Sequence, residues 1–150
     1  MSRAVLSRLR ERAVERPLPP GTDLAECKLD PARLIRLWDH TDLAVVLEAA
    51  HTRPSHPGRI HLLQLDAPRL ARPDELGPRG LGQALEVAWE LHRLPGRLVA
   101  YAVEVADTAL GTGLSPSVAA VVDTLVVRVE DKIVRHRVAA ARGTTDPATA

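Results

Sequence analysis

The hydrophobic positions of this chain change their spacing several times, and each change marks a predicted element. In four segments apolar residues recur every three or four positions, which places them on one side of an α-helix. These segments are 5–13, 34–38, 81–91 and 118–133. Between them stand nearly unbroken apolar runs, LAVVL at 43–47 and LVAYAV at 98–103. Such runs predict central strands that are covered on both faces.

Two further segments have weaker strand patterns. Residues 22–28 are short and alternating, and residues 59–66 mix apolar with polar positions. Both are predicted to be strands, and the imperfect pattern of the second favours an edge position or an antiparallel direction. Helices that alternate with strands predict an α/β fold, namely a three-layer α/β/α sandwich around a largely parallel, twisted sheet.

Helix caps and breakers set the expected boundaries. Asp30 and Ser115 each precede a proline, as an N-cap residue does before the first helical position, and PLPPG at 17–21 ends the first helix. Residues 138–150 offer little to bury. We therefore expect a single domain over residues 1–137, followed by a disordered tail.

Composition narrows the classes of function. Twenty basic and nineteen acidic residues give a net charge of +1, so nothing favours nucleic acid or an anionic membrane as a partner. No apolar stretch approaches the roughly 20 residues that span a bilayer, and the N-terminus lacks a signal-peptide pattern. The single cysteine, Cys27, cannot form an internal disulfide and is expected to be a buried, small apolar side chain. We expect a cytoplasmic protein.

The strand-to-helix corner that follows residue 104 contains the most distinctive motif. Gly111 and Gly113 permit backbone conformations that a side chain would forbid, and the segment reads G-x-G-L-S-P-x-V from 111 to 118. This corner resembles that of the nickel-iron hydrogenase maturation peptidases, which trim the C-terminus of a hydrogenase large subunit after its metal is installed. The Ser115 hydroxyl is expected to cap the helix, because no Ser/His/Asp constellation accompanies it.

The resemblance extends upstream in the same order. DLAVVLEAA at 42–50 matches the family's strand ending in D-A, and the P-G turn at 57–58 precedes a matching strand. GPRGLGQALEVAWEL at 77–91 matches the family's S-x-H-G-L-G helix entry. Together these segments cover most of residues 3–137. The resemblance implies an α/β/α fold with a crevice beyond the carboxyl ends of the strands.

The resemblance also implies a site for the nickel of the substrate protein, with three ligands. The first is a carboxylate of a D-D-G-x-G element after the family's first strand, and this chain begins within the helix that follows. The second, an aspartate at a strand end, is matched by Glu48, and the third, the histidine of S-x-H-G, by Arg79. Arginine has no lone pair for a metal. His51, three residues after Glu48, is a candidate substitute because imidazole binds nickel well.

Each of these residues has an alternative interpretation. Glu48 could be a hydrogen-bonded strand end, and Arg79 could be a solvated cation or an ion-pair partner of Glu48. Glu104 matches a glutamate or glutamine that the family often carries, which implies a role with Gly111 and Gly113 in binding the substrate polypeptide. The alternative is a structural hydrogen-bonding role at the strand end. His51, His56 and His61 recur every five residues, and surface positions are expected for them.

Three hypotheses for function follow from the resemblance. The first is an endopeptidase that removes the C-terminal extension of a nickel-iron hydrogenase large-subunit precursor after nickel insertion. The second is a catalytically inactive homologue that binds a maturation partner, motivated by the absent acidic element and by Arg79. The third is that the natural protein is longer than this chain. Because the family's first strand lies between two others, its absence predicts marginal stability or oligomerisation.

Overall fold

Helices and strands alternate along the chain, as the hydrophobic pattern predicts. A computed structural model describes residues 1–28, 30–66, 81–106 and 113–143. The helices are α1 (Ser2–Glu15), α2 (Pro31–Trp38), α3 (Leu81–Glu90) and α4 (Pro116–Gly143), and the strands are β1 (Leu43–Ala50), β2 (Ile60–Leu65) and β3 (Arg97–Glu104). Within those ranges, no helix combines the length and the apolarity needed to cross a membrane.

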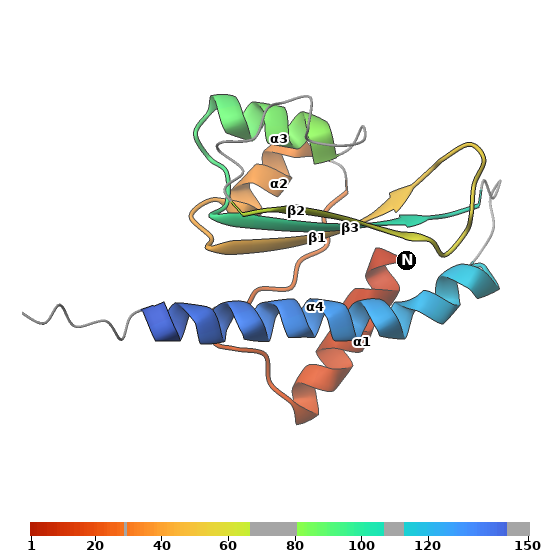
Figure 1. Cartoon of the computed structure of the whole chain (residues 1–150), viewed down its shortest axis with the longest axis horizontal. Helices are drawn as coiled ribbons and strands as arrows, with labels where there is room; N and C mark the ends of the chain where they lie inside the picture. Colours follow the sequence, from red (N-terminus) through yellow and green to blue (C-terminus); the bar gives the residue numbers. More distant parts are fainter. Residues whose placement is uncertain (29, 67–80, 107–112, 144–150) are drawn as a thin grey trace, which may run out of the picture.

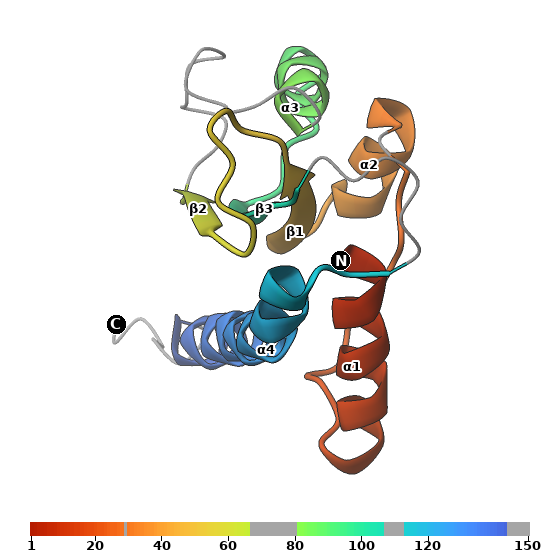
Figure 2. The ribbon, with the colours of Figure 1, turned by 90° about the vertical axis from the view of Figure 1, so that its right-hand side faces the viewer.

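The sheet is open and mixed, with the strand order β1-β3-β2. β1 pairs with β3 in parallel, and β2 pairs with β3 in antiparallel. Figure 2 shows β1 and β2 on either side of β3, with α4 beneath the sheet. The prediction that residues 59–66 lie at an edge or run antiparallel is confirmed in both respects, because β2 does both.

β3 is the centre of the molecule, and every residue of this strand after Arg97 is buried. Helices cover both faces of the sheet, with α1 and α4 on one side and α2 and α3 on the other (Figure 1). Alternate residues of β3 therefore enter different cores. Val99, Tyr101 and Val103 pack with α1 and α4, whereas Leu98 and Ala100 pack with α2 and α3. The predicted α/β fold is confirmed.

The predicted helix caps are present. The Asp30 side chain accepts a hydrogen bond from the Ala32 N–H at 3.1 Å, and the Ser115 hydroxyl accepts one from the Val118 N–H at 3.3 Å. Each bond satisfies a backbone donor that the first turn of a helix leaves without an intrahelical partner. Ser115 therefore acts as a cap of α4.

Two predictions about the strands are wrong. Residues 22–28 do not form a strand, because their polar side chains leave only Leu24 to pack against the α1–α4 core. β1 is therefore an edge strand in the part of the chain that the structure describes, although its apolar run predicted a central one. No residue of β1 is fully buried.

Three smaller expectations also need correction. α4 continues through residues 138–143, which the sequence analysis assigned to the disordered tail, because three consecutive alanines at 139–141 favour a helix. Residues 144–150, also assigned to the tail, lie outside the described ranges. Trp89, whose position within the apolar spacing of 81–91 predicts a place in the core, is 40% exposed, since it lies one position off the buried stripe of α3. Cys27 is only partly buried.

Candidate functional site

Two carboxylates lie at the carboxyl ends of the adjacent parallel strands β1 and β3. Ala44 and Val46 pack toward α2 and α3, and side chains alternate along a strand, so Glu48 lies on the same face. The same alternation from Ala100 places Glu104 on this face. Glu48 is opposite Ala102, and Glu104 is opposite Ala50, two residues farther along. The two acidic residues therefore share one face and one end of the sheet.

Glu104 is buried, with 2% of its surface exposed, and the chain's own groups occupy both of its carboxylate oxygens. Oε2 accepts a hydrogen bond from the His56 backbone N–H at 2.6 Å, and Oε1 lies 2.6 Å from His61 Nε2. These two hydrogen bonds lower the pKa of Glu104 to about 2, and the one from the His56 N–H has the larger effect. Glu104 is therefore ionised near neutral pH and anchors the connection between β1 and β2.

The ionised state of Glu104 determines which nitrogen of His61 carries a proton. A carboxylate accepts hydrogen bonds and cannot donate them, so His61 Nε2 must be the donor. In the neutral ring, Nδ1 is then left as an acceptor. The side chain of His61 is about half exposed, so this nitrogen is not sealed in the core. Metal-binding and catalytic histidines also donate a hydrogen bond from one ring nitrogen to a carboxylate, which fixes their tautomer in the same way.

Glu48 is half-buried and lies next to the first turn of α3. Burial raises the pKa of its carboxyl group, and the hydrogen bond that it accepts from the Leu81 backbone N–H opposes that rise. Leu81 is the first residue of α3, so its N–H has no partner within the helix. A negative charge at a helix N-terminus is also stabilised by the helix dipole.

Glu48 and His61 lie in one row across the sheet, separated only by Ala102. Ala102 pairs in register with Glu48 on one side and with His61 on the other. Neighbouring strands are about 4.8 Å apart, so the Cα atoms of Glu48 and His61 are separated by roughly 10 Å across a small side chain. The row offers a carboxylate and an imidazole, both of which bind metals or carry protons.

The other residues singled out from the sequence are placed as follows. Arg79 and Gly111 lie outside the described ranges. Gly113 has a φ of 114°, a conformation that favours glycine, just before α4. His51 follows the end of β1 and is exposed. Among the described residues, no group of three or more His, Cys, Asp or Glu side chains could hold a metal ion.

The sequence analysis did not predict that His56 and His61 contact Glu104. These residues are separated from Glu104 by 48 and 43 positions, and only the antiparallel return of β2 along β3 brings them together. The available signal was the P-G turn at 57–58, which lies between the two histidines and lets the chain reverse toward β3.

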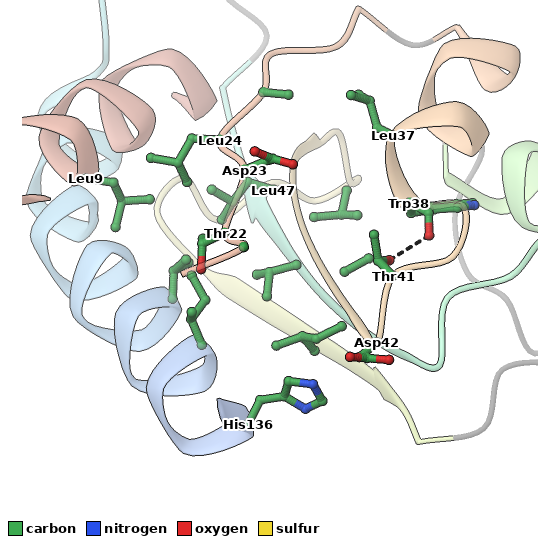
Figure 3. A pocket seen from close by; sticks show the side chains of 18 of the residues that line it. Leu9, Thr22, Asp23, Leu24, Leu37, Trp38, Thr41, Asp42, Leu47 and His136 are labelled. Carbon is green, nitrogen blue, oxygen red and sulfur yellow. Dashed lines mark hydrogen bonds between the residues drawn. The ribbon is translucent and has the colours of Figure 1, made fainter. Parts of the chain in front are cut away.

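A cavity of about 560 Å³ lies along the outer edge of β1. Its walls come from α1, residues 19–27, α2, β1 and the second half of α4. Glu48 and Leu81 belong to its lining, so it adjoins the carboxylate site. Figure 3 shows Asp23 and Leu24 near Leu47, toward the end of β1, and His136 near Asp42 at the opposite end.

No family model and no curated protein matches this sequence. Solved structures are nevertheless similar to it. The hydrogenase maturating endopeptidase HybD from E. coli has a TM-score of 0.65 and 18% identity, covering 97% of this chain and 86% of that one. An endopeptidase from Escherichia coli, known from a solution structure, has a TM-score of 0.63 and 21% identity, with 86% and 82% covered. The chain shares the fold of these endopeptidases.

Proposed function

We propose that this chain is an endopeptidase that removes the C-terminal extension of a nickel-iron hydrogenase large-subunit precursor after nickel insertion. The observation that carries the proposal is the position of Glu48. It lies two residues before the end of β1, beside the N-terminus of α3, and it matches the metal-binding aspartate that the resembled family has at a strand end. The fold shared with two endopeptidases and the colinear motifs over residues 3–137 support the same activity.

Glu48 is the residue of this chain that fits the nickel of the substrate best. Its carboxylate is half-buried, and one hydrogen bond from Leu81 still leaves lone pairs for a divalent metal. Arg79, at the position of the family histidine, has no lone pair, and Glu104 is engaged by His56 and His61. The metal of the substrate would polarise the scissile carbonyl or position water.

Peptide hydrolysis also requires a proton carrier. Water adds to the carbonyl carbon, the C–N bond breaks, and a proton passes from the attacking water to the leaving amine. Glu48 is assigned to the metal, so His61, held by Glu104 with Nδ1 as an acceptor, is the group on this face that can take up and release this proton.

The test is incubation with a nickel-loaded precursor subunit, with loss of its C-terminal peptide followed by mass spectrometry. We expect cleavage by the wild type and a fall in kcat/KM of about 100-fold or more for Glu48→Ala, as loss of a metal contact produces. Glu86→Ala is the matched control, because Glu86 is an exposed glutamate on α3. Binding of the precursor without cleavage would instead favour the inactive homologue.

A further inference from the structure

The outer edge of β2 presents backbone groups away from the sheet. In the described ranges β2 pairs with β3 alone, and it lies on the side of β3 opposite to β1 (Figure 2). A strand added beside β1 would therefore leave β2 at the edge. The Glu104 N–H donates to the Arg59 carbonyl at 2.9 Å, and the bonded pairs of an antiparallel ladder recur at every second residue. The odd-numbered residues of β2 therefore bond to β3, whereas Ile60, Leu62 and Gln64 direct their backbone groups outward.

An exposed apolar side chain lies beside this edge. Leu62 is in register with Tyr101, which packs in the core between the sheet and α4, so Leu62 lies on the same face. It is nevertheless 54% exposed. Gln64, two residues farther along, lies on this face as well, and its Oε1 accepts a hydrogen bond from Lys132 Nζ at 3.0 Å. A strand added to β2 would cover Leu62 and lie against this side of α4.

The side of α4 that adjoins β2 carries positive charge. Lys132 lies there because it donates to β2. Burial raises the pKa of the Tyr101 hydroxyl, the charge of Arg128 opposes this rise and that of Asp131 adds to it, so both charges lie near the hydroxyl. Asp131 pairs with Arg135 at 2.8 Å, so its charge is compensated. Within the described ranges, neither Arg128 nor Lys132 pairs with a carboxylate.

These charges favour an acidic occupant over a second copy of this chain. If two copies paired through β2 about a two-fold axis at Leu62, their α4 helices would lie on the same face of the joined sheet. Arg128 and Lys132 of one copy would then lie near the same cations of the other, and like charges repel. A cation beside an edge strand also discourages pairing with an identical edge. Carboxylates on an added strand would instead form ion pairs with both residues.

We propose that the outer edge of β2 binds an extended acidic segment of a partner protein, which adds a strand to the sheet. Main-chain hydrogen bonds to Leu62 and Gln64 would supply affinity, and carboxylates facing Arg128 and Lys132 would select the partner. The six residues of β2 span about 20 Å, which corresponds to a segment of about six residues. Glu48 lies on the opposite face of the sheet, with β3 between it and β2, so this binding surface does not depend on the proposed peptidase activity.

The first experiment uses a fluorescein-labelled, C-terminally amidated peptide in which threonines alternate with glutamate, valine and glutamate, so that the charges share one face. Its binding to the 150-residue chain is followed by fluorescence anisotropy. N-methylation of alternate residues removes the N–H donors from one edge of the peptide. Because only one edge bonds to β2, we expect one set of N-methyl groups to weaken binding about tenfold or more and the other to have little effect. Equal affinity of the two N-methylated peptides, or no binding of the unmodified peptide, would overturn the proposal.

The second experiment tests the charges. We expect replacement of both glutamates of the peptide by lysine to weaken binding about tenfold or more. Arg128→Gln and Lys132→Gln should each weaken binding of the acidic peptide about twofold to fivefold, as loss of an exposed ion pair does. Arg16→Gln is the control, because Arg16 is an exposed cation that follows α1. If all three variants bind the acidic peptide equally well, the assignment of the charges is overturned.

Hydrogen exchange followed by NMR locates the bound peptide. We expect the peptide to slow exchange of the Leu62 and Gln64 N–H groups about tenfold or more, because they become bonded. The N–H groups of His61 and Leu63 already bond to β3 and should change little. Unchanged exchange at Leu62 and Gln64 with the peptide bound would overturn the proposal.

Sedimentation velocity distinguishes the acidic segment from a second copy of this chain as the occupant. Leu62→Asp places a charge on the edge at a side chain that is already exposed. A monomeric wild type, or self-association that Leu62→Asp leaves unchanged, supports the proposal. Self-association that Leu62→Asp abolishes would mean that β2 pairs with the β2 of another copy, and it would overturn the proposal. These assays need neither nickel nor a precursor subunit, so they fail independently of the proposed function.

Discussion

The position of Glu104 in the fold determines its hydrogen-bond partners and lowers the pKa of its carboxyl group. A carboxylate at the end of a fully buried strand is costly unless it is hydrogen-bonded. His56 and His61 provide the bonds, and they lower the pKa of Glu104 to about 2. These contacts correspond to the structural hydrogen-bonding role considered for Glu104 at the strand end. They also orient the ring of His61.

The lowered pKa of Glu104 predicts how stability depends on pH. Between the ordinary value of 4.5 and the folded value of about 2, the unfolded chain binds more protons at this group than the folded chain does. The contribution of Glu104 is therefore complete above about pH 4.5 and is lost as the pH falls toward 2. We expect urea unfolding between pH 5 and 2 to show a steeper loss of stability for the wild type than for Glu104→Gln. Identical slopes would contradict this assignment.

At the scale of elements, the turn before β2 depends on a close approach to α4. Gly58 has a φ of 91°, and a Cβ built on it would lie 2.6 Å from the Ser117 carbonyl oxygen. The Gly58 N–H also donates to the Glu104 carbonyl at 2.9 Å. This glycine therefore holds the loop that carries His56 between β3 and the first turn of α4.

Replacement of Gly58 by alanine should be more costly than the same change at Gly21. Gly21 has a similar φ of 82° but nothing within 4 Å of its Cβ position, so Gly21→Ala measures the backbone strain alone. We expect that strain to cost about 1 kcal/mol and Gly58→Ala to cost about 3 kcal/mol, because the backbone must also shift. Urea unfolding of both variants measures the difference. Equal costs would show that the approach to Ser117 imposes no constraint.

The free edge of β1 predicts an alternating pattern of hydrogen exchange. The N–H groups of the even-numbered residues from Ala44 to Ala50 bond to β3 and should exchange slowly. Those of the odd-numbered residues face the cavity and should exchange faster, by about tenfold or more. Exchange followed residue by residue by NMR measures the pattern. Uniform protection along β1 would mean that another strand covers this edge.

For the molecule as a whole, β3 has helices on both faces and a strand on each side, whereas β1 has one neighbouring strand in the described ranges. The strand predicted at 22–28 does not cover that edge. An uncovered edge beside an apolar cavity limits the apolar area that folding buries and invites pairing with another chain.

We therefore expect the 150-residue chain to be marginally stable or to self-associate. Its melting temperature should lie below about 60 °C, within the range of mesophilic domains. Circular dichroism melts at several protein concentrations, together with sedimentation, measure both properties. A monodisperse monomer that melts cooperatively above about 60 °C would contradict this expectation.

The type of each element follows from local spacing, which explains why the sequence was sufficient to predict it. The stripe of α4, the apolar run of β3, the edge position of β2 and the cap at Ser115 were all predicted and are all present. Periodicity and capping depend on residues within a few positions of one another. The placement of Glu48 at the end of β1 follows from the same kind of information.

The neighbours of each element were decided by the tertiary structure. The apolar run at 43–47 is compatible with a central or an edge strand, and in the described ranges it is an edge strand because it pairs with β3 alone. The contact of His61 with Glu104 joins residues 43 positions apart through antiparallel pairing. Pairing of distant segments depends on the free energy of the whole core, because the entropy of closing the intervening loop must be offset there.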